Sequence, residues 1–89
     1  MLVTKQFKVV AVSENTNSFG LKQMYMVAKD GSAFRACFNS LNVKQKDEVI
    51  NGSVTVDDNG KELRTEFVGG ELCEKLLSPP LETVRAIWN

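Results

Sequence analysis

The chain has 89 residues, of which 43% are hydrophobic and 25% are charged, and eleven basic residues balance eleven acidic ones. This composition predicts one small globular domain, and the zero net charge argues against nucleic-acid binding through bulk electrostatics. No apolar run approaches the ~18 residues of a membrane span, so we expect neither a membrane-embedded protein nor one with a signal peptide.

The first half of the chain predicts a long strand followed by a hairpin. Residues 5–14, "KQFKVVAVSE", are rich in Val and Phe and predict the strand. The Asn, Ser and Gly residues of 15–20 then mark a loop. Residues 21–28 and 32–39 are two further apolar segments separated by a short turn, which predicts that they pair as antiparallel strands.

The turn of this hairpin decides which side chains face outward. A three-residue turn over 29–31, Lys-Asp-Gly, uses the glycine for a left-handed conformation. It pairs Met26 with Phe34 on the inner face and Tyr25 with Arg35 on the outer face. A two-residue turn would mix apolar and polar residues on each face, so we prefer the three-residue turn; a slip of one residue would invert every assignment.

The second half predicts another hairpin after a polar connection. Residues 53–70, "SVTVDDNGKELRTEFVGG", alternate polar and apolar around Asn59-Gly60, a strong signal for a two-residue hairpin turn. This turn pairs the strands as follows: Val56 with Leu63, Thr55 with Arg64, Val54 with Thr65, and Ser53 with Glu66. Gly52 falls among the inward residues, where a missing side chain marks a bulge or a sharp bend.

The C-terminal part predicts helix. In 71–77, "ELCEKLL", the leucines have helical spacing, and Ser78-Pro79-Pro80 ends the segment. A second short helix over 81–88 carries an apolar stripe. The residues of this stripe, which we expect to pack on the barrel or on a partner such as a second copy of the chain, are Leu81, Val84, Ile87 and Trp88.

Five strands in this arrangement predict a mainly β fold: a five-stranded, OB-fold-like barrel with one or two short C-terminal helices. We place the barrel at 1–72 and the helical extension at 73–89. Residues 44–72, "KQKDEVINGSVTVDDNGKELRTEFVGGEL", resemble the single-stranded-DNA-binding proteins of bacteria and their phages. The resemblance follows the element order over 5–72, and it implies action in replication or genome protection in the cytoplasm of a bacterial or infected cell.

The residues offer little chemistry for catalysis. The chain has no histidine, which removes the commonest general base and metal ligand together. Cys37 and Cys73 are 36 positions apart, so a zinc site is not expected, although a single disulfide stays open. No phosphate-binding glycine loop follows any strand. We therefore expect no enzyme, no cofactor, no metal site and no small-molecule substrate.

Binding a single strand requires only aromatic faces for the bases and positive charge for the phosphates. Residues 1–46 carry a charge balance of +5 and residues 47–89 one of −5, so charge is polarised along the chain. The basic and aromatic residues that we expect to contact nucleic acid are Lys8, Phe19, Lys22, Tyr25, Arg35, Lys44, Lys46 and Arg64. The remaining phenylalanines, 7, 34, 38 and 67, are expected in the core.

Two functions follow from these features. The first is a single-stranded nucleic-acid-binding protein of low sequence specificity, with DNA as the expected ligand. The alternative is an OB-like protein-interaction module, an inhibitor or assembly factor, that docks through its apolar C-terminal helix. The Tyr25–Arg35 pair and the basic first half favour the first function, whereas the zero net charge and Trp88 favour the second.

Overall fold

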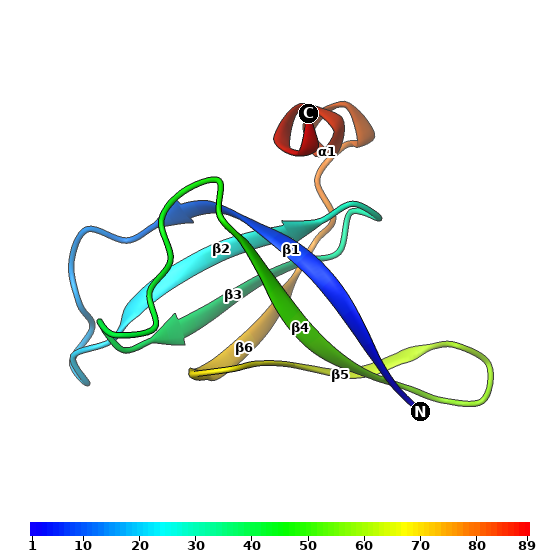
Figure 1. Cartoon of the computed structure of the whole chain (residues 1–89), viewed down its shortest axis with the longest axis horizontal. Coiled ribbons are helices and arrows are strands. Elements are labelled where there is room, and N and C mark those ends of the chain that lie inside the picture. The colour runs from blue at the N-terminus through cyan, green and yellow to red at the C-terminus, as the bar shows by residue number, and fades with distance from the viewer.

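The computed structural model describes the whole backbone, residues 1–89, and every side chain except those of Leu72 and Cys73. The chain is mainly β with one short C-terminal helix, in agreement with the sequence (Figure 1). The elements are β1 (Leu2–Val12), β2 (Lys22–Ala28), β3 (Ala33–Phe38), β4 (Val49–Val56), β5 (Glu62–Phe67), β6 (Gly70–Leu76) and α1 (Leu81–Trp88).

The strands form one sheet in the order β5-β4-β1-β2-β3-β6, and every ladder in it is antiparallel. The sheet curls into a nearly closed, OB-like barrel, because its two edge strands, β5 and β6, meet at the turn between them (Figure 1). The barrel therefore has six strands in the described chain, one more than the five expected.

The extra strand corrects one sequence prediction. The leucine spacing of 71–77 predicts a helix, but 70–76 is strand β6 and pairs with β3. The edge of β3 offers a row of hydrogen-bonding groups, and pairing with it overrides a helical pattern only two turns long. The boundary at residue 72 is wrong for the same reason: the barrel extends to Leu76, and α1 is the one helix of the C-terminal region.

The β2–β3 hairpin has the register expected from its turn. Gly31 has a φ of 93° and donates its N–H to the Ala28 carbonyl, and the Ala28 N–H in turn bonds the Ser32 carbonyl. Tyr25 lies opposite Arg35 and Met26 opposite Phe34. The prediction that the first pair faces outward and the second inward is confirmed, since Met26 is fully buried whereas Arg35 is exposed.

The β4–β5 hairpin keeps the expected pairing except at its tip. Thr55, Val54 and Ser53 have the predicted partners, but Val56 lies opposite Glu62 instead of Leu63. The Gly60 N–H bonds to the Asp57 carbonyl, and Gly60 has a φ of 80°, so the turn holds three residues instead of two. A bulge then restores the register and leaves Leu63 61% exposed.

The barrel interior is a close-packed apolar cluster built around phenylalanines. Its buried members are Phe7, Val9, Met24, Met26, Ala28, Phe34, Ala36, Phe38 and Phe67. The Phe7 and Phe67 rings meet edge to face with centroids 5.0 Å apart. Gly52 lies directly beside these two rings: a Cβ there would come within 2.8 Å of Phe7 and 2.9 Å of Phe67. A glycine at this position is therefore required by packing.

A second apolar cluster lies on the outside of the barrel, beneath α1. Val84 is buried against Val27 and Ala33 there, with Ile87 and Trp88 packed alongside. The Trp88 Nε1–H donates a 2.9 Å hydrogen bond to the Val27 carbonyl. Three residues of the predicted interface stripe thus pack on the barrel of the same chain, the first of the two expected outcomes.

Leu81, the fourth residue of that stripe, is 62% exposed. Pairing of two chains through α1 stays a prediction. It was based on an apolar stripe, and three of the four residues of that stripe pack on the barrel of the same chain.

We predict that Gly52→Ala destabilises the protein by about 1–3 kcal/mol, because the new methyl group overpacks the Phe7–Phe67 contact. Denaturant melts measure the free energy of unfolding. Asn51→Ala, at the exposed neighbouring position of the same strand, is the control and should change it by less than about 0.5 kcal/mol. A Gly52→Ala protein as stable as the unchanged chain would contradict the packing described.

Candidate nucleic-acid interface

The predicted interface centres on the outer surface of β2 and β3. Tyr25 and Arg35 are directly opposite one another there, and Glu74 of β6 follows next to Arg35. Opposite residues in an antiparallel pair have Cβ atoms about 4.5–5.5 Å apart, so ring and guanidinium are neighbours. We call Tyr25, Arg35 and Glu74 the outer row.

Arg35 is held within this row by Glu74. Its Nε–H and one Nη2–H donate to Glu74 Oε2, at 3.3 Å and 2.7 Å. These hydrogen bonds, and then the charge of Glu74, raise the pKa of Arg35 above its ordinary value. Its side chain is 46% exposed, and three of its five N–H donors remain for another acceptor.

Helix α1 forms a wall beside the outer row. Tyr25 is half-buried because one side of it packs against the cluster beneath α1. Trp88, in the same cluster, lies under two ammonium groups: Lys8 Nζ is 5.8 Å and Lys29 Nζ 5.2 Å from the ring centroid. Cation–π attraction favours both placements.

The sequence predicts Lys8 as a nucleic-acid contact. It does not predict Lys29 as one, and it does not predict that Trp88 lies near Tyr25. No spacing could have revealed this group, since 59 positions separate Lys29 from Trp88 and only the folded helix brings them together.

The other predicted residues divide between two places. The antiparallel order puts three connections at one end of the barrel, residues 13–21, 39–48 and 68–69, which we call the loop end. Four predicted residues lie in or next to these connections: Phe19, Lys22, Lys44 and Lys46. Phe19 is 81% exposed at the tip of its loop, and Asn17 Oδ1 accepts hydrogen bonds from the backbone of Phe19 and Leu21.

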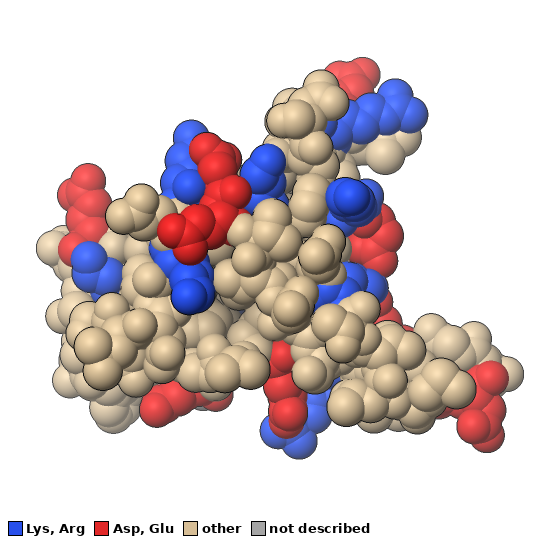
Figure 2. Space-filling view, viewed as in Figure 1, with Lys and Arg blue, Asp and Glu red and all other residues tan. Residues whose placement is uncertain are grey.

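Arg64 is not brought together with the others. It lies on β5, which two strands separate from β2 in the sheet, and it is paired with Glu66 at 2.6 Å. Figure 2 shows that on the face drawn there, basic and acidic side chains are interspersed, without a large area of one sign. The excess of bases in 1–46 therefore does not become a continuous basic surface on that face.

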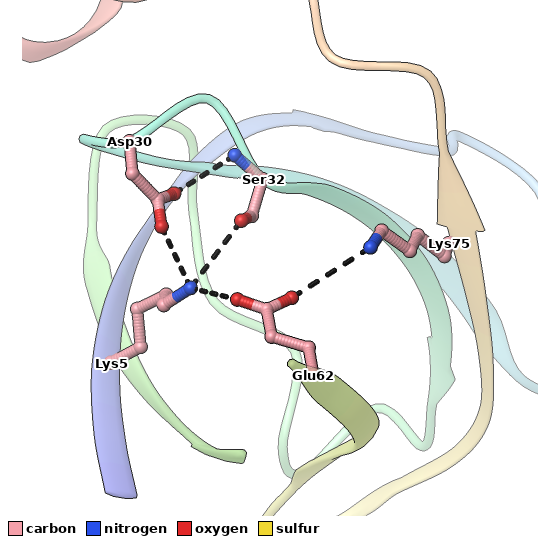
Figure 3. Close-up of polar contacts among 5 residues, drawn as sticks. All are labelled: Lys5, Asp30, Ser32, Glu62 and Lys75. Carbon is pink, nitrogen blue, oxygen red and sulfur yellow. Dashed lines mark hydrogen bonds and ion pairs between the residues drawn. The ribbon is translucent and has the colours of Figure 1, made fainter. Parts of the chain in front are cut away.

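The opposite end of the barrel interior is closed by a polar cluster (Figure 3). Lys5 has the inward parity of Phe7, and its Nζ donates to Asp30 Oδ2 at 2.7 Å, to Ser32 Oγ at 3.4 Å and to Glu62 Oε1. Glu62 also pairs with Lys75 across the β5–β6 seam at 3.8 Å. The cluster thus connects β1, the β2–β3 turn, β5 and β6.

Ion pairing outweighs burial in this cluster. Burial alone lowers the pKa of Lys5, but hydrogen bonds to Asp30 and Glu62 and their charges raise it above its ordinary value. Burial alone raises the pKa of Asp30, but hydrogen bonds from Lys5 and Ser32 and the Lys5 charge bring it below its ordinary value. Both groups are therefore charged at neutral pH and stabilise the fold there.

The described residues contain no group of three potential metal ligands, and the Cys37 side chain is buried. The Cys73 side chain, on which the open disulfide prediction depends, lies outside the described residues. None of the helices described is long and apolar enough to cross a membrane. Comparison with protein-family models, curated proteins and solved structures finds no match, so the function rests on this geometry.

We predict that Asp30→Asn lowers the free energy of unfolding at pH 7 by about 0.5–1 kcal/mol, a small value because the carboxylate is half exposed. Since the folded-state pKa is lowered, the contribution of Asp30 is complete above about pH 4 and is lost as the pH falls through the folded-state value. In denaturant melts between pH 7 and 2, the difference in free energy of unfolding between Asp30→Asn and the unchanged chain should therefore shrink as the pH falls.

Asp58→Asn, in the exposed β4–β5 turn, is the matched control, and we expect it to change the free energy of unfolding by less than about 0.5 kcal/mol. A gap for Asp30→Asn that stays constant down to pH 2 would show that Lys5 does not stabilise the charged form of Asp30.

Proposed function

We propose that this protein binds single-stranded nucleic acid, with DNA as the expected ligand, across the outer row and with low sequence specificity. The observation that carries the proposal is the placement of Tyr25 directly beside Arg35 on the outside of the barrel. An aromatic face next to a planar cation matches the two repeating parts of a single strand, the base and the phosphate.

Two further features support binding at this surface. Lys8 and Lys29 flank Trp88 beside the row and add two positive charges near Tyr25. At the loop end, the exposed Phe19 and nearby Lys22 offer a second aromatic and basic pair. A strand bound along this path would meet aromatic and cationic groups in turn, a pattern that tolerates any base because every base has a π-face.

The charge of the outer row limits the strength of binding. Glu74 occupies part of the Arg35 donor set and is itself 61% exposed, so an incoming phosphate meets a carboxylate beside the guanidinium. With zero net charge as well, few counterions are released, and the dependence of affinity on salt should be shallow. Under this proposal the protein acts on exposed single strands during replication or genome protection in the cytoplasm of a bacterial or phage-infected cell.

We predict that Tyr25→Leu weakens binding of a fluorescent oligo-dT by ~1–3 kcal/mol, because it removes the stacking ring but retains apolar contact with α1. Tyr25→Phe, which keeps the ring, should bind nearly as well as the unchanged chain. Neither substitution removes a charge, so the slope of log affinity against log salt should not change.

Arg35→Ala should weaken binding and also reduce that salt slope by about one, because it removes one phosphate contact. Arg64→Ala is the control, since it removes an exposed, ion-paired arginine away from the row. The proposal fails if the unchanged chain does not bind oligo-dT at about 50 mM salt, a condition that favours phosphate contacts, or if Tyr25→Leu and Tyr25→Phe bind equally.

A further inference from the structure

The barrel is incomplete at the seam between its edge strands. β5 and β6 meet at the turn over 68–69 and diverge from it (Figure 1). Between them lies an open groove of about 470 Å³ that borders neither Tyr25 nor Arg35. We call it the seam groove; among the side chains that the structure describes, those of β5 and β6 that line it are Glu62, Leu63, Arg64, Thr65, Glu66, Phe67, Gly70, Glu71 and Lys75.

The walls of the groove are strand edges. β5 is paired with β4 on one side and β6 with β3 on one side, and the other side of each faces the seam. Along an edge, alternate residues direct their N–H and C=O groups away from the sheet. The chemical partner that matches such a row of alternating donors and acceptors is another extended backbone.

The floor of the groove is formed by three buried apolar residues, Phe34 and Ala36 from β3 and Phe67 from β5, each of which is at most 6% exposed. All three belong to the buried interior cluster, and the Phe34 and Phe67 rings lie 6.0 Å apart. A strand entering the seam would point every second side chain at this floor, so it needs apolar residues at those positions.

The rim of the groove disfavours an anionic ligand. It carries three carboxylates, of Glu62, Glu66 and Glu71, against the two cations of Arg64 and Lys75. Each cation is already paired with a carboxylate of the rim. Arg64 lies 2.6 Å from Glu66, and Lys75 lies 3.8 Å from Glu62, a pair that Figure 3 shows. A phosphate backbone would be repelled here, whereas a neutral or basic polypeptide would not.

We propose that the seam groove binds an extended segment of a partner polypeptide, neutral or basic and alternately apolar, which adds as a strand to the edge of β5. Its apolar side chains contact Phe34 and Phe67, and its backbone pairs with β5. This site is separate from the outer row and independent of nucleic-acid binding.

The test uses the synthetic peptide acetyl-Lys-Val-Thr-Val-Thr-Val-Lys-amide with the full chain. One derivative is N-methylated at the valines and a second at the threonines, which blocks the hydrogen-bonding edge on one side of the strand or on the other. The parent peptide should bind, and one of the two derivatives should bind at least about tenfold more weakly because it loses two or three backbone hydrogen bonds. No binding at millimolar peptide, or equal binding of all three peptides, would overturn the proposal.

Two charge-reversal variants locate the site. The first variant carries Glu66→Lys and Glu71→Lys together. It should bind the lysine-containing parent peptide about three- to tenfold more weakly, since both carboxylates lie on the rim. Glu82→Lys, on exposed α1, should not weaken it. Equal losses in the two proteins, or displacement of the peptide by oligo-dT, would assign binding to general charge or to the outer row and would overturn the proposal.

Discussion

The contact between Gly52 and the rings of Phe7 and Phe67 is the constraint on which the rest of the barrel depends. Three strands meet at this point, β1 through Phe7, β4 through Gly52 and β5 through Phe67. Any larger residue at position 52 would displace one of the two rings. Once these strands are fixed in register, the period of two sends every second residue of β1 and its neighbours outward, so the interior packing determines which side chains the outer surface can offer.

The outer surface is then divided by α1. The helix is too short to be stable alone in water and is held by Val84 and by the hydrogen bond of Trp88 to Val27. It covers Val27 and leaves Tyr25 half-buried at its side. The proposed nucleic-acid site and the seam groove therefore lie on different parts of the barrel, one beside the helix and one between the edge strands.

The sequence predicts the structure correctly where neighbouring residues along the chain determine it. Turn chemistry at Gly31 and clean alternation predict the β2–β3 register in full, and with it the outward placement of Tyr25. Strand β6 could not be predicted, because its leucine spacing fits a helix and its pairing with β3 is a tertiary interaction. Lys5 was also missed as a structural residue: its partners are 25 and 57 positions away, and a lone lysine in a strand gives no sign of facing inward.

The most direct test of the account is an amide and side-chain NMR titration of the ¹⁵N-labelled chain with an oligo-dT of about twelve nucleotides, within the range of site sizes of single barrels. We predict shift changes concentrated at Tyr25, Arg35 and the Trp88 indole, with β5 unchanged. Shift changes confined to β5 and β6, or no changes at saturating oligonucleotide, would contradict it.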